Sequence, residues 1–403
     1  PPPSFFLPPI IMDDNIAQLI FFAIVGLIAM IYYGIPSRTK TIGIDLGTTY
    51  SLAAYMNPND YSLHLVPSVS SVVTYFPNKT HIVGYSQFRR KSPENTIFEA
   101  KRFIGRTFKE VNDNLSLKKD GSNKYYPFKI VPLNDGESIG FYIPAIDKVV
   151  DPIEIGSKIV EELKRRVDAQ LGHRMARSVV IATPAEFTAL QKEYTAQVFE
   201  RAGYRVTATL DEPTAAAMAY GLHRQDNINY VLVYDWGGGT LDIALLWIKD
   251  GNVQLLSTDG DRDFGGANID QCLFDLLKNK FPPNDSKCPS HVLLPIAEET
   301  KIKLSKYDQT TVRCGRSIYT IDRKEFETHC EDILDRAMLS MERLLDESKV
   351  RNNEIDAVVL VGGSTRIPSL RSRLTRFFNG KKPLTDIDPD TAVAVGCARA
   401  SED

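Results

Sequence analysis

The chain has 403 residues, enough for two to three domains and for a large apolar core that needs no disulfide or metal staple. It carries 48 Lys and Arg against 51 Asp and Glu, and the net charge of −3 argues against a dedicated nucleic-acid binder. Hydrophobic residues make up 43% and charged residues 25%, which excludes wholesale disorder and a polytopic membrane protein.

Residues 1–15 are rich in proline and do not begin with Met, so a gene-model or fragment artefact is one explanation for them. Residues 16–35 follow as an apolar run in which Gln18 is the only strongly polar side chain. About 20 apolar residues suffice to cross a bilayer as a helix, so we expect a transmembrane or signal-anchor segment here. A buried core helix is the weaker alternative, because soluble helices of this length carry a polar face.

The charges that flank this run and the glycosylation tripeptides favour different compartments. Arg38 and Lys40 follow the run, and the positive-inside tendency would place the rest of the chain in the cytosol. Tripeptides for N-glycosylation begin at Asn78, Asn114 and Asn284 and would be usable in the secretory lumen. These residues alone leave both orientations open, and it is the family resemblance carried by the later motifs that implies an endoplasmic-reticulum or microsomal protein with a lumenal core.

The five cysteines form no compact framework and no closely spaced pair. Buried thiols are the simpler interpretation of them. A bridge between Cys314 and Cys330 in an oxidising compartment is the alternative.

An internal duplication divides the rest of the chain. Residues 41–57 read as a strand, a turn with Asp45, Gly47, Thr48, Thr49 and Tyr50, and a second strand. Residues 230–246 repeat this pattern with Asp235, three glycines (Gly237, Gly238, Gly239) and Thr240 in the turn. Two related halves, each opening with a hairpin, are therefore expected.

These turns have the chemistry of a phosphate site. Glycines allow close approach of the backbone to a ligand, so that successive N–H groups face phosphate oxygens, and the threonines add hydroxyl donors. Asp45, Asp235 and Asp242 beside a polyphosphate make sense if Mg²⁺ lies between them. The alternative, two ordinary glycine-rich hairpins, is weakened by the repetition.

Two further segments fit the same site. Glu212 precedes Pro213 at the entrance to a helix-prone stretch at 214–220, where a simple helix-capping role is about as good an interpretation. Near the C-terminus, an apolar strand at 357–361 leads into Gly362, Gly363 and Ser364 and then a helical pattern. A strand, a glycine turn and a helix start suit close contact with a nucleotide.

Together these segments resemble the nucleotide-binding domain of the seventy-kilodalton heat-shock (Hsp70) family, within the actin and sugar-kinase superfamily. The matching stretches are 43–51 (GIDLGTTYS), 100–106 (AKRFIGR), 211–222 (DEPTAAAMAYGL), 234–242 (YDWGGGTLD), 264–266 (FGG) and 359–368 (VLVGGSTRIP). The resemblance implies an α/β, actin-like (ribonuclease H-like) duplicated ATPase fold with two lobes around a nucleotide cleft. Lobe I would span residues 41–222 and lobe II residues 223–403.

The resemblance also implies a role for each matching residue. Lys101, Glu212 and Asp235 would be catalytic, with Lys101 positioning the attacking water. Asp45, Asp235 and Asp242 would hold Mg²⁺, largely through water. The residues that would bind ATP or ADP are Gly47, Thr48, Thr49, Tyr50, Gly237, Gly238, Gly239, Thr240, Gly265, Gly266, Glu298, Lys301, Ser305, Gly362, Gly363, Ser364, Arg366 and Asp390.

Several positions depart from the family's usual pattern. Ile302 stands where an arginine commonly stacks on adenine, so adenine would be held by apolar packing alone. Asn268 replaces an aspartate, Lys192 an arginine and Trp236 a smaller apolar residue.

We therefore expect ATP binding and slow, Mg²⁺-dependent hydrolysis that assists protein folding or the stress response. Because the chain ends at Asp403, we expect no peptide-binding domain, as in the truncated, microsome-associated members that this sequence resembles, including at 185–187 (AEF). A nucleotide-exchange factor or a J-domain-type co-chaperone would be the protein partner, and no nucleic acid is expected. The alternatives are a membrane-tethered nucleotide switch with little hydrolysis, a small-molecule kinase and an actin-like filament protein.

Overall fold

The computed structural model describes residues 18–19, 21–26, 41–57, 60–123, 125–133, 135–171, 176–281 and 288–401. Within the expected anchor, residues 18–19 and 21–26 are helical, and the rest of 16–35 lies outside the described residues, as do 1–15 and Asn284. No helix among the described residues combines the length and the apolar character needed to span a bilayer. The anchor therefore stays a prediction.

The first sheet has the strand order β11-β10-β1-β2-β3. Strands β1 and β2 form the antiparallel hairpin expected from the sequence, and β10 runs parallel to β1 on its other side. The apolar residues of β1 and β10 are buried, as is usual for strands covered on both faces. The strands are β1 (Ile42–Asp45), β2 (Tyr50–Met56), β3 (Leu63–Ser70), β10 (Ser178–Thr183) and β11 (Arg205–Asp211).

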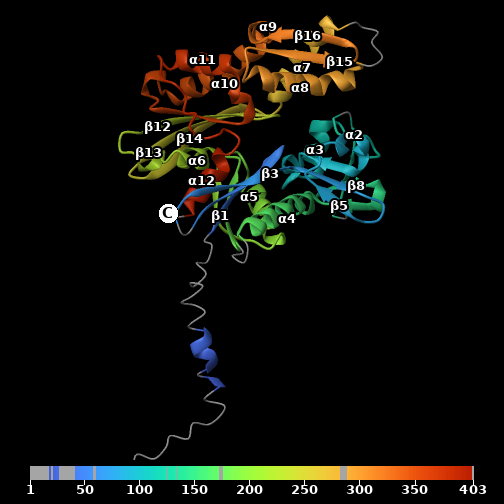
Figure 1. The fold of residues 1–403 in the computed structure, drawn as a ribbon, viewed down its shortest axis with the longest axis vertical. Coiled ribbons are helices and arrows are strands. Elements are labelled where there is room, and N and C mark those ends of the chain that lie inside the picture. Colours follow the sequence, from blue (N-terminus) through green and yellow to red (C-terminus); the bar gives the residue numbers. More distant parts are fainter. Residues whose placement is uncertain are drawn as a thin grey trace, which may run out of the picture.

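The second sheet repeats this topology with the order β14-β13-β12-β17. Strands β12 and β13 form the second antiparallel hairpin, and β17 runs parallel to β12 in the place that β10 takes beside β1. The duplication inferred from the two turns is thus confirmed (Figure 1). The strands are β12 (Tyr230–Trp236), β13 (Leu241–Lys249), β14 (Asn252–Asp261) and β17 (Ala357–Val361).

Smaller elements surround the first sheet. Two three-stranded sheets, β5-β4-β6 and β7-β8-β9, lie beyond β3, and the long helix α4 packs on β3 and on α5. They comprise β4 (Val72–Tyr75), β5 (His81–Val83), α2 (Phe88–Lys91), β6 (Thr96–Phe98), α3 (Phe108–Leu115), β7 (Lys129–Pro132), β8 (Ile139–Ile143), β9 (Lys148–Val150), α4 (Pro152–Leu171) and α5 (Ala189–Arg201), with short 3-10 turns η1 (Pro93–Asn95), η2 (Ala100–Phe103) and η3 (Pro144–Ile146).

The second sheet carries helices and a separate hairpin. Helices α7 and α8 pack on each other, and α8 also packs on the hairpin β15–β16. These elements are α7 (Gly266–Lys280), α8 (Ser290–Leu304), β15 (Gln309–Cys314), β16 (Ser317–Asp322), α9 (Arg323–His329), α10 (Glu331–Ser348) and α11 (Pro368–Phe377), with η4 (Leu222–Arg224), η5 (Asn352–Glu354) and η6 (Gly363–Arg366).

Two disulfides lie in this region. They join Cys272 to Cys330 and Cys288 to Cys314, while Cys397 is a buried free thiol. The interpretation as buried thiols is therefore wrong for every cysteine except Cys397. The alternative Cys314–Cys330 pairing is also wrong, because the packing of α7 beside α9 and of α8 beside β15 gives each of these cysteines a different neighbour.

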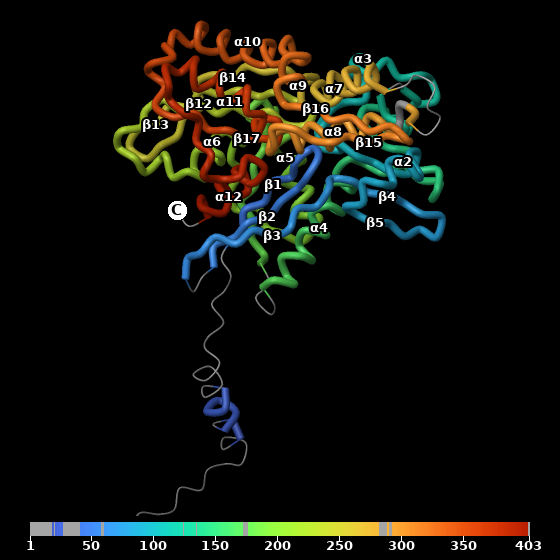
Figure 2. Tube along the Cα trace, turned by 45° about the horizontal axis from the view of Figure 1, so that its top comes forward, coloured from blue at the N-terminus to red at the C-terminus, as the bar shows by residue number. Residues whose placement is uncertain are grey.

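Two helices rich in small residues pack against each other between the two sheets, and we call this contact the seam. Helix α6 (Glu212–Ala219) follows β11, and α12 (Ala392–Ala400), the last described helix, packs on α6 and on β1. Both views place α12 beside β1, so the end of the chain returns to the half in which the first sheet lies (Figures 1 and 2). The division of the chain into lobes at residue 222 stays a prediction.

Backbone contact at this seam depends on Gly396. A Cβ at this position would overlap the carbonyl of Ala215 in α6, and Ala215, Ala394 and Ala398 are completely buried. Small side chains therefore let α12 and α6 approach to backbone contact.

We expect Gly396→Ala to destabilise the protein by about 3 kcal/mol, because the two helices must separate to accept one methyl group. Chemical unfolding followed by circular dichroism measures this. Ala400→Ser, at the partly exposed end of the same helix, is the control and should change stability by less than about 0.5 kcal/mol. Equal stability of the two variants would contradict the close packing described.

Candidate functional site

The two glycine turns, one from each hairpin, lie close to each other. Ser71 holds the first turn, since its Oγ donates to Gly47 O at 2.8 Å and its N–H donates to Thr49 O at 2.8 Å. A Cβ built on Gly238 of the second turn would lie 3.3 Å from Thr49 Oγ1. The hairpins thus bring together turns that are far apart in the sequence. Tyr50 begins β2 with 60% of its surface exposed.

The second turn is fixed by the helix that follows β14. Gly266 N and Ala267 N, at the start of α7, donate to Gly237 O and Gly238 O, both at 2.9 Å. Ser364 Oγ donates to Gly237 O at 2.9 Å from the third glycine segment. The turn, α7 and η6 therefore meet at one point, as the sequence predicts for residues 237–240, 265–266 and 362–364.

Gly362 needs a conformation and a space that only glycine has. Its φ is +81°, and a Cβ would lie 2.5 Å from Trp236 O and 2.7 Å from Asp235 Oδ1. Trp236 itself is fully buried and stacks on Phe264 with ring centroids 5.6 Å apart. The backbone of the third segment thus lies directly on the strand that carries Asp235.

The residues expected around the adenosine form two clusters. Lys301 of α8 is paired with Asp270 at 2.7 Å and donates to Gly266 O at 3.3 Å. Arg366 is paired with Asp390 at 2.8 Å and also with Asp388. Ser305 caps α8 by donating to Lys301 O at 2.9 Å, and Glu298 is exposed one turn before Lys301.

Lys101 is buried against Glu212, 111 positions along the chain. Its Nζ lies 2.5 Å from Glu212 Oε1, and only 8% of the lysine side chain is exposed. Lys101 sits on η2, while Glu212 is the first residue of α6, with Pro213 in the first helical turn. The ion pair with Glu212 therefore holds the Lys101 ammonium inside the protein, whereas an unpaired lysine would extend into solvent.

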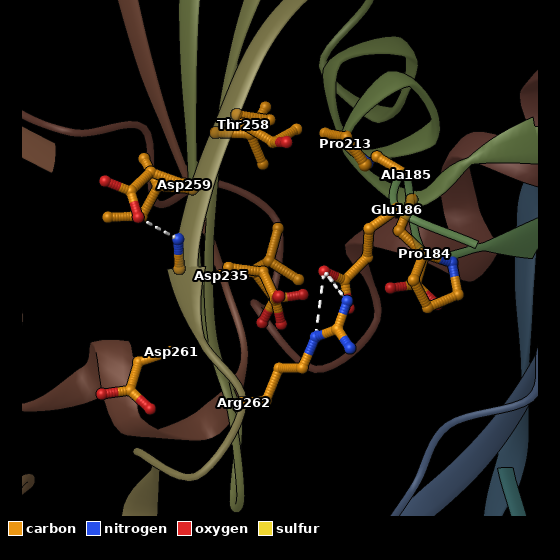
Figure 3. Close-up of a pocket in the computed structure, with 16 residues that line it drawn as sticks. Pro184, Ala185, Glu186, Pro213, Asp235, Thr258, Asp259, Asp261 and Arg262 are labelled. Atoms are coloured by element: carbon orange, nitrogen blue, oxygen red, sulfur yellow. Dashed lines mark hydrogen bonds and ion pairs between the residues drawn. The ribbon is translucent and has the colours of Figure 1, made fainter. Parts of the chain in front are cut away.

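Acidic side chains gather beside this pair. Asp235 and Asp242 are cross-strand partners on β12 and β13. Both line, with Glu212, a cavity of about 170 Å³ that also contacts Pro184 and Val361 (Figure 3). Asp45 ends β1 outside this lining, and its charge interacts with Lys101 and Glu212.

Burial makes these carboxylates hard to ionise together. Burial raises the pKa of Asp45 to about 6, although Lys101 opposes the shift. It also raises the pKa of Asp242 to about 6, against a hydrogen bond from Thr240. The pKa of Asp235 lies well above its ordinary value because of burial and the charge of Asp242. For Lys101, burial alone would lower the pKa, but Glu212 and Asp45 outweigh it and raise the pKa.

Among the described residues, no three acidic, histidine or cysteine side chains lie close enough together to ligate a metal ion directly. Asp45, Asp235 and Asp242 would therefore hold a hard divalent cation largely through its waters. Oxygen ligands at several carboxylates are what Mg²⁺ prefers, and one lysine cannot neutralise four acids. Burial, followed by repulsion from neighbouring acids, raises the pKa values of Asp45, Asp235 and Asp242, so a cation beside them would stabilise their ionised forms.

One contact across the cavity was not predicted. Glu186, after β10, pairs with Arg262, after β14, at 2.9 Å (Figure 3). Arg102 Nη1 donates to Arg262 O at 3.1 Å beside the second turn. The unusual 185–187 segment is the sequence feature that could have pointed to Glu186. Arg262 stands in a run of charged residues that matches no recognisable motif.

Comparison with known proteins agrees with this geometry. Residues 41–402 match the Hsp70 protein family, described as Hsp70 protein. This chain belongs to the Hsp70 family. It is 34% identical over 384 residues to a chaperone protein DnaK of Prochlorococcus marinus (strain MIT 9515), an alignment that includes 89% of this chain and 58% of that protein. The chain thus spans less than two thirds of this Hsp70 relative.

Membership of the Hsp70 family confirms the predicted α/β, two-lobe, actin-like fold. The roles of the individual residues stay predictions, although the structure brings most of them together. Glu298 and Tyr50 are exposed on the elements that carry them, as are Thr49, Gly238 and Asp390.

We expect Asp45→Asn to raise the free energy of unfolding at pH 7.5, without metal or nucleotide, by about 3 kcal/mol. The pKa of Asp45 is raised from 3.8 to about 6, so the folded state binds this proton more tightly than the unfolded state does. The free energy of unfolding therefore falls as the pH rises through 6, and at pH 7.5 the ionised carboxylate carries the full cost. Urea unfolding measures the difference.

The same comparison at pH 5 is the control. There the folded protein holds the proton on Asp45, so the advantage of Asn should be clearly smaller than at pH 7.5. A pH-independent difference, or a less stable variant, would show that ionised Asp45 does not destabilise the folded protein.

Proposed function

We propose that this chain binds ATP with Mg²⁺ and hydrolyses it slowly. The observation that carries the proposal is the convergence of two facing glycine turns on four half-buried carboxylates and the buried Lys101. Backbone N–H groups of the turns would hold the β- and γ-phosphates. The glycine segment at 362–364 and Lys301 would hold the adenosine side.

Lys101 is the group best suited to act on the γ-phosphate. Its ammonium is held at Glu212, so no side-chain ordering is needed when the phosphate charge develops. Together with Glu212 and Asp235 it would orient a water for attack on phosphorus, in line with the leaving β-phosphate oxygen. Asp45, Asp235 and Asp242 would hold Mg²⁺, which supplies charge neutralisation of the phosphate oxygens when bound.

Removing Lys101 tests the hydrolytic step. We expect Lys101→Ala to slow phosphate release by roughly 100-fold, because one preorganised charge at the transition state is lost. Lys101→Gln should be similarly slow. Because Gln can still donate a hydrogen bond to Glu212, this variant separates loss of the ammonium charge from loss of the partner of Glu212. Single-turnover phosphate release on the purified chain is the measurement.

Lys129→Ala is the matched control, since Lys129 pairs with exposed Asp120 and is itself 43% exposed. Its rate should equal that of the unsubstituted chain. Equal rates in the Lys101 variants would remove this lysine from the mechanism. Tight ATP binding without hydrolysis in the unsubstituted chain would instead favour the nucleotide-switch alternative.

The proposal extends to attachment at a membrane and a lumenal core. Leu19, Phe21 and Phe22, within the apolar run, are 71%, 63% and 70% exposed, which suits contact with lipid. Two disulfides are typical of oxidising compartments, and this favours the lumen over the cytosol. Such a protein would resemble the microsome-associated members of the family and work with a nucleotide-exchange factor or a J-domain-type partner.

Glycosylation distinguishes the two sides of the membrane. Asn78 is exposed in a turn between β4 and β5, where its side chain accepts from Thr80 Oγ1 at 2.6 Å. In microsomes, we expect the full chain to resist protease and to shift in mobility after glycosidase treatment, and Asn78→Gln to remove part of that shift. Complete digestion without a shift would place the core in the cytosol.

A further inference from the structure

A groove on the outer face of α7 exposes one of the disulfides. It has a volume of about 430 Å³ and runs between α7 and the start of α10, with Asp275, His329, Ile333 and Arg336 among its lining residues. Cys272 also lines it, while its partner Cys330 is 1% exposed. A molecule in the groove therefore reaches the disulfide from the Cys272 side.

This disulfide joins two helices with different structural roles. Cys272 lies on α7, less than two turns after Gly266 and Ala267, whose N–H groups fix the second phosphate turn. Cys330 is the single residue between α9 and α10, and α10 packs on β13 and β14 of the second sheet. The bond thus ties the helix that holds the phosphate turn to the helix that lies on the sheet.

The geometry points to Cys272–Cys330 as a thiol–disulfide exchange site whose opening loosens α7 and speeds nucleotide release. The reactant is a thiol that enters the groove. The effect on release rests on the proposed nucleotide binding, whereas the loosening of α7 does not.

The exchange is balanced in two steps. An incoming thiolate attacks Cys272 Sγ, forming a mixed disulfide, and the electron pair of the broken S–S bond leaves on Cys330 as a thiolate. A second thiol then attacks the sulfur of the bound reagent, which releases Cys272 as a thiolate and the reagent as a disulfide. Cys330 is the N-cap residue of the 18-residue helix α10, whose N-terminal end offsets part of the cost of a thiolate in the apolar core.

The second disulfide provides a matched control. Cys288 precedes α8 and Cys314 ends β15, and α8 and β15 already pack on each other. Opening this bond leaves α7 and its hydrogen bonds to the phosphate turn tied to α10.

Hydrogen exchange of the full chain tests the inference without nucleotide. After Cys272→Ser with Cys330→Ser, the amides of Gly266 and Ala267 should exchange faster, and Cys288→Ser with Cys314→Ser should leave them unchanged. Folded, unsubstituted protein reduced with glutathione and then alkylated should reproduce the first result, which guards against misfolded variants. A parallel arm with a thioredoxin-type protein dithiol distinguishes a small thiol from a protein reductant as the source.

Release of a fluorescent ADP is the second readout. Opening Cys272–Cys330 should speed release by about fivefold or more, and opening Cys288–Cys314 should not. Absence of ADP binding in every form would refute the proposed function, and the exchange data would still decide the inference. Unchanged exchange at Gly266 and Ala267 after reduction, or peptide mapping that finds Cys272 and Cys330 unbonded in the unreduced chain, would overturn it.

Discussion

Backbone contact between α12, α6 and β1 is the constraint on which the rest of the structure depends. Gly396 and the buried alanines around it let two helices fit between the sheets, and each sheet presents its hairpin turn toward that seam. A wider seam would move Thr49 away from Gly238 and would separate Glu212, at the start of α6, from the aspartates on β12 and β13. Small side chains at the seam thus determine the geometry of a polar site.

Repulsion among carboxylates of like charge is the second constraint on this site. Asp45, Asp235 and Asp242 lie half-buried with Glu212, and Lys101 supplies a single ammonium among them. Such a cluster costs stability in the absence of a cation, which is consistent with a site built for ligand and metal at the expense of the empty protein. The Glu186–Arg262 pair adds a contact between the same two sheets at the cavity, where it is well exposed.

Local patterns predicted much of this, and contacts distant in sequence were the part they missed. The two hairpins, β17 and the glycine segments follow from alternating apolar runs interrupted by glycine, which are properties of neighbouring residues. Lys101 has no local signal for its role, because its partner Glu212 lies 111 positions away, and only the family resemblance singles it out. The two disulfides were missed for the same reason, since spacing along the chain does not show that α7 lies beside α9. The position of α12 against β1 also has no local signal.

Trp236 gives the molecule an internal optical reporter. The chain has two tryptophans, and Trp236 is fully buried between the second glycine turn and Phe264, while Trp247 is partly exposed at the opposite end of the same hairpin. Indole emission responds to the polarity and packing around the ring. Intrinsic fluorescence therefore contains one component from the centre of the site and one from its periphery, and conformational changes at the turn are visible without a dye or a label.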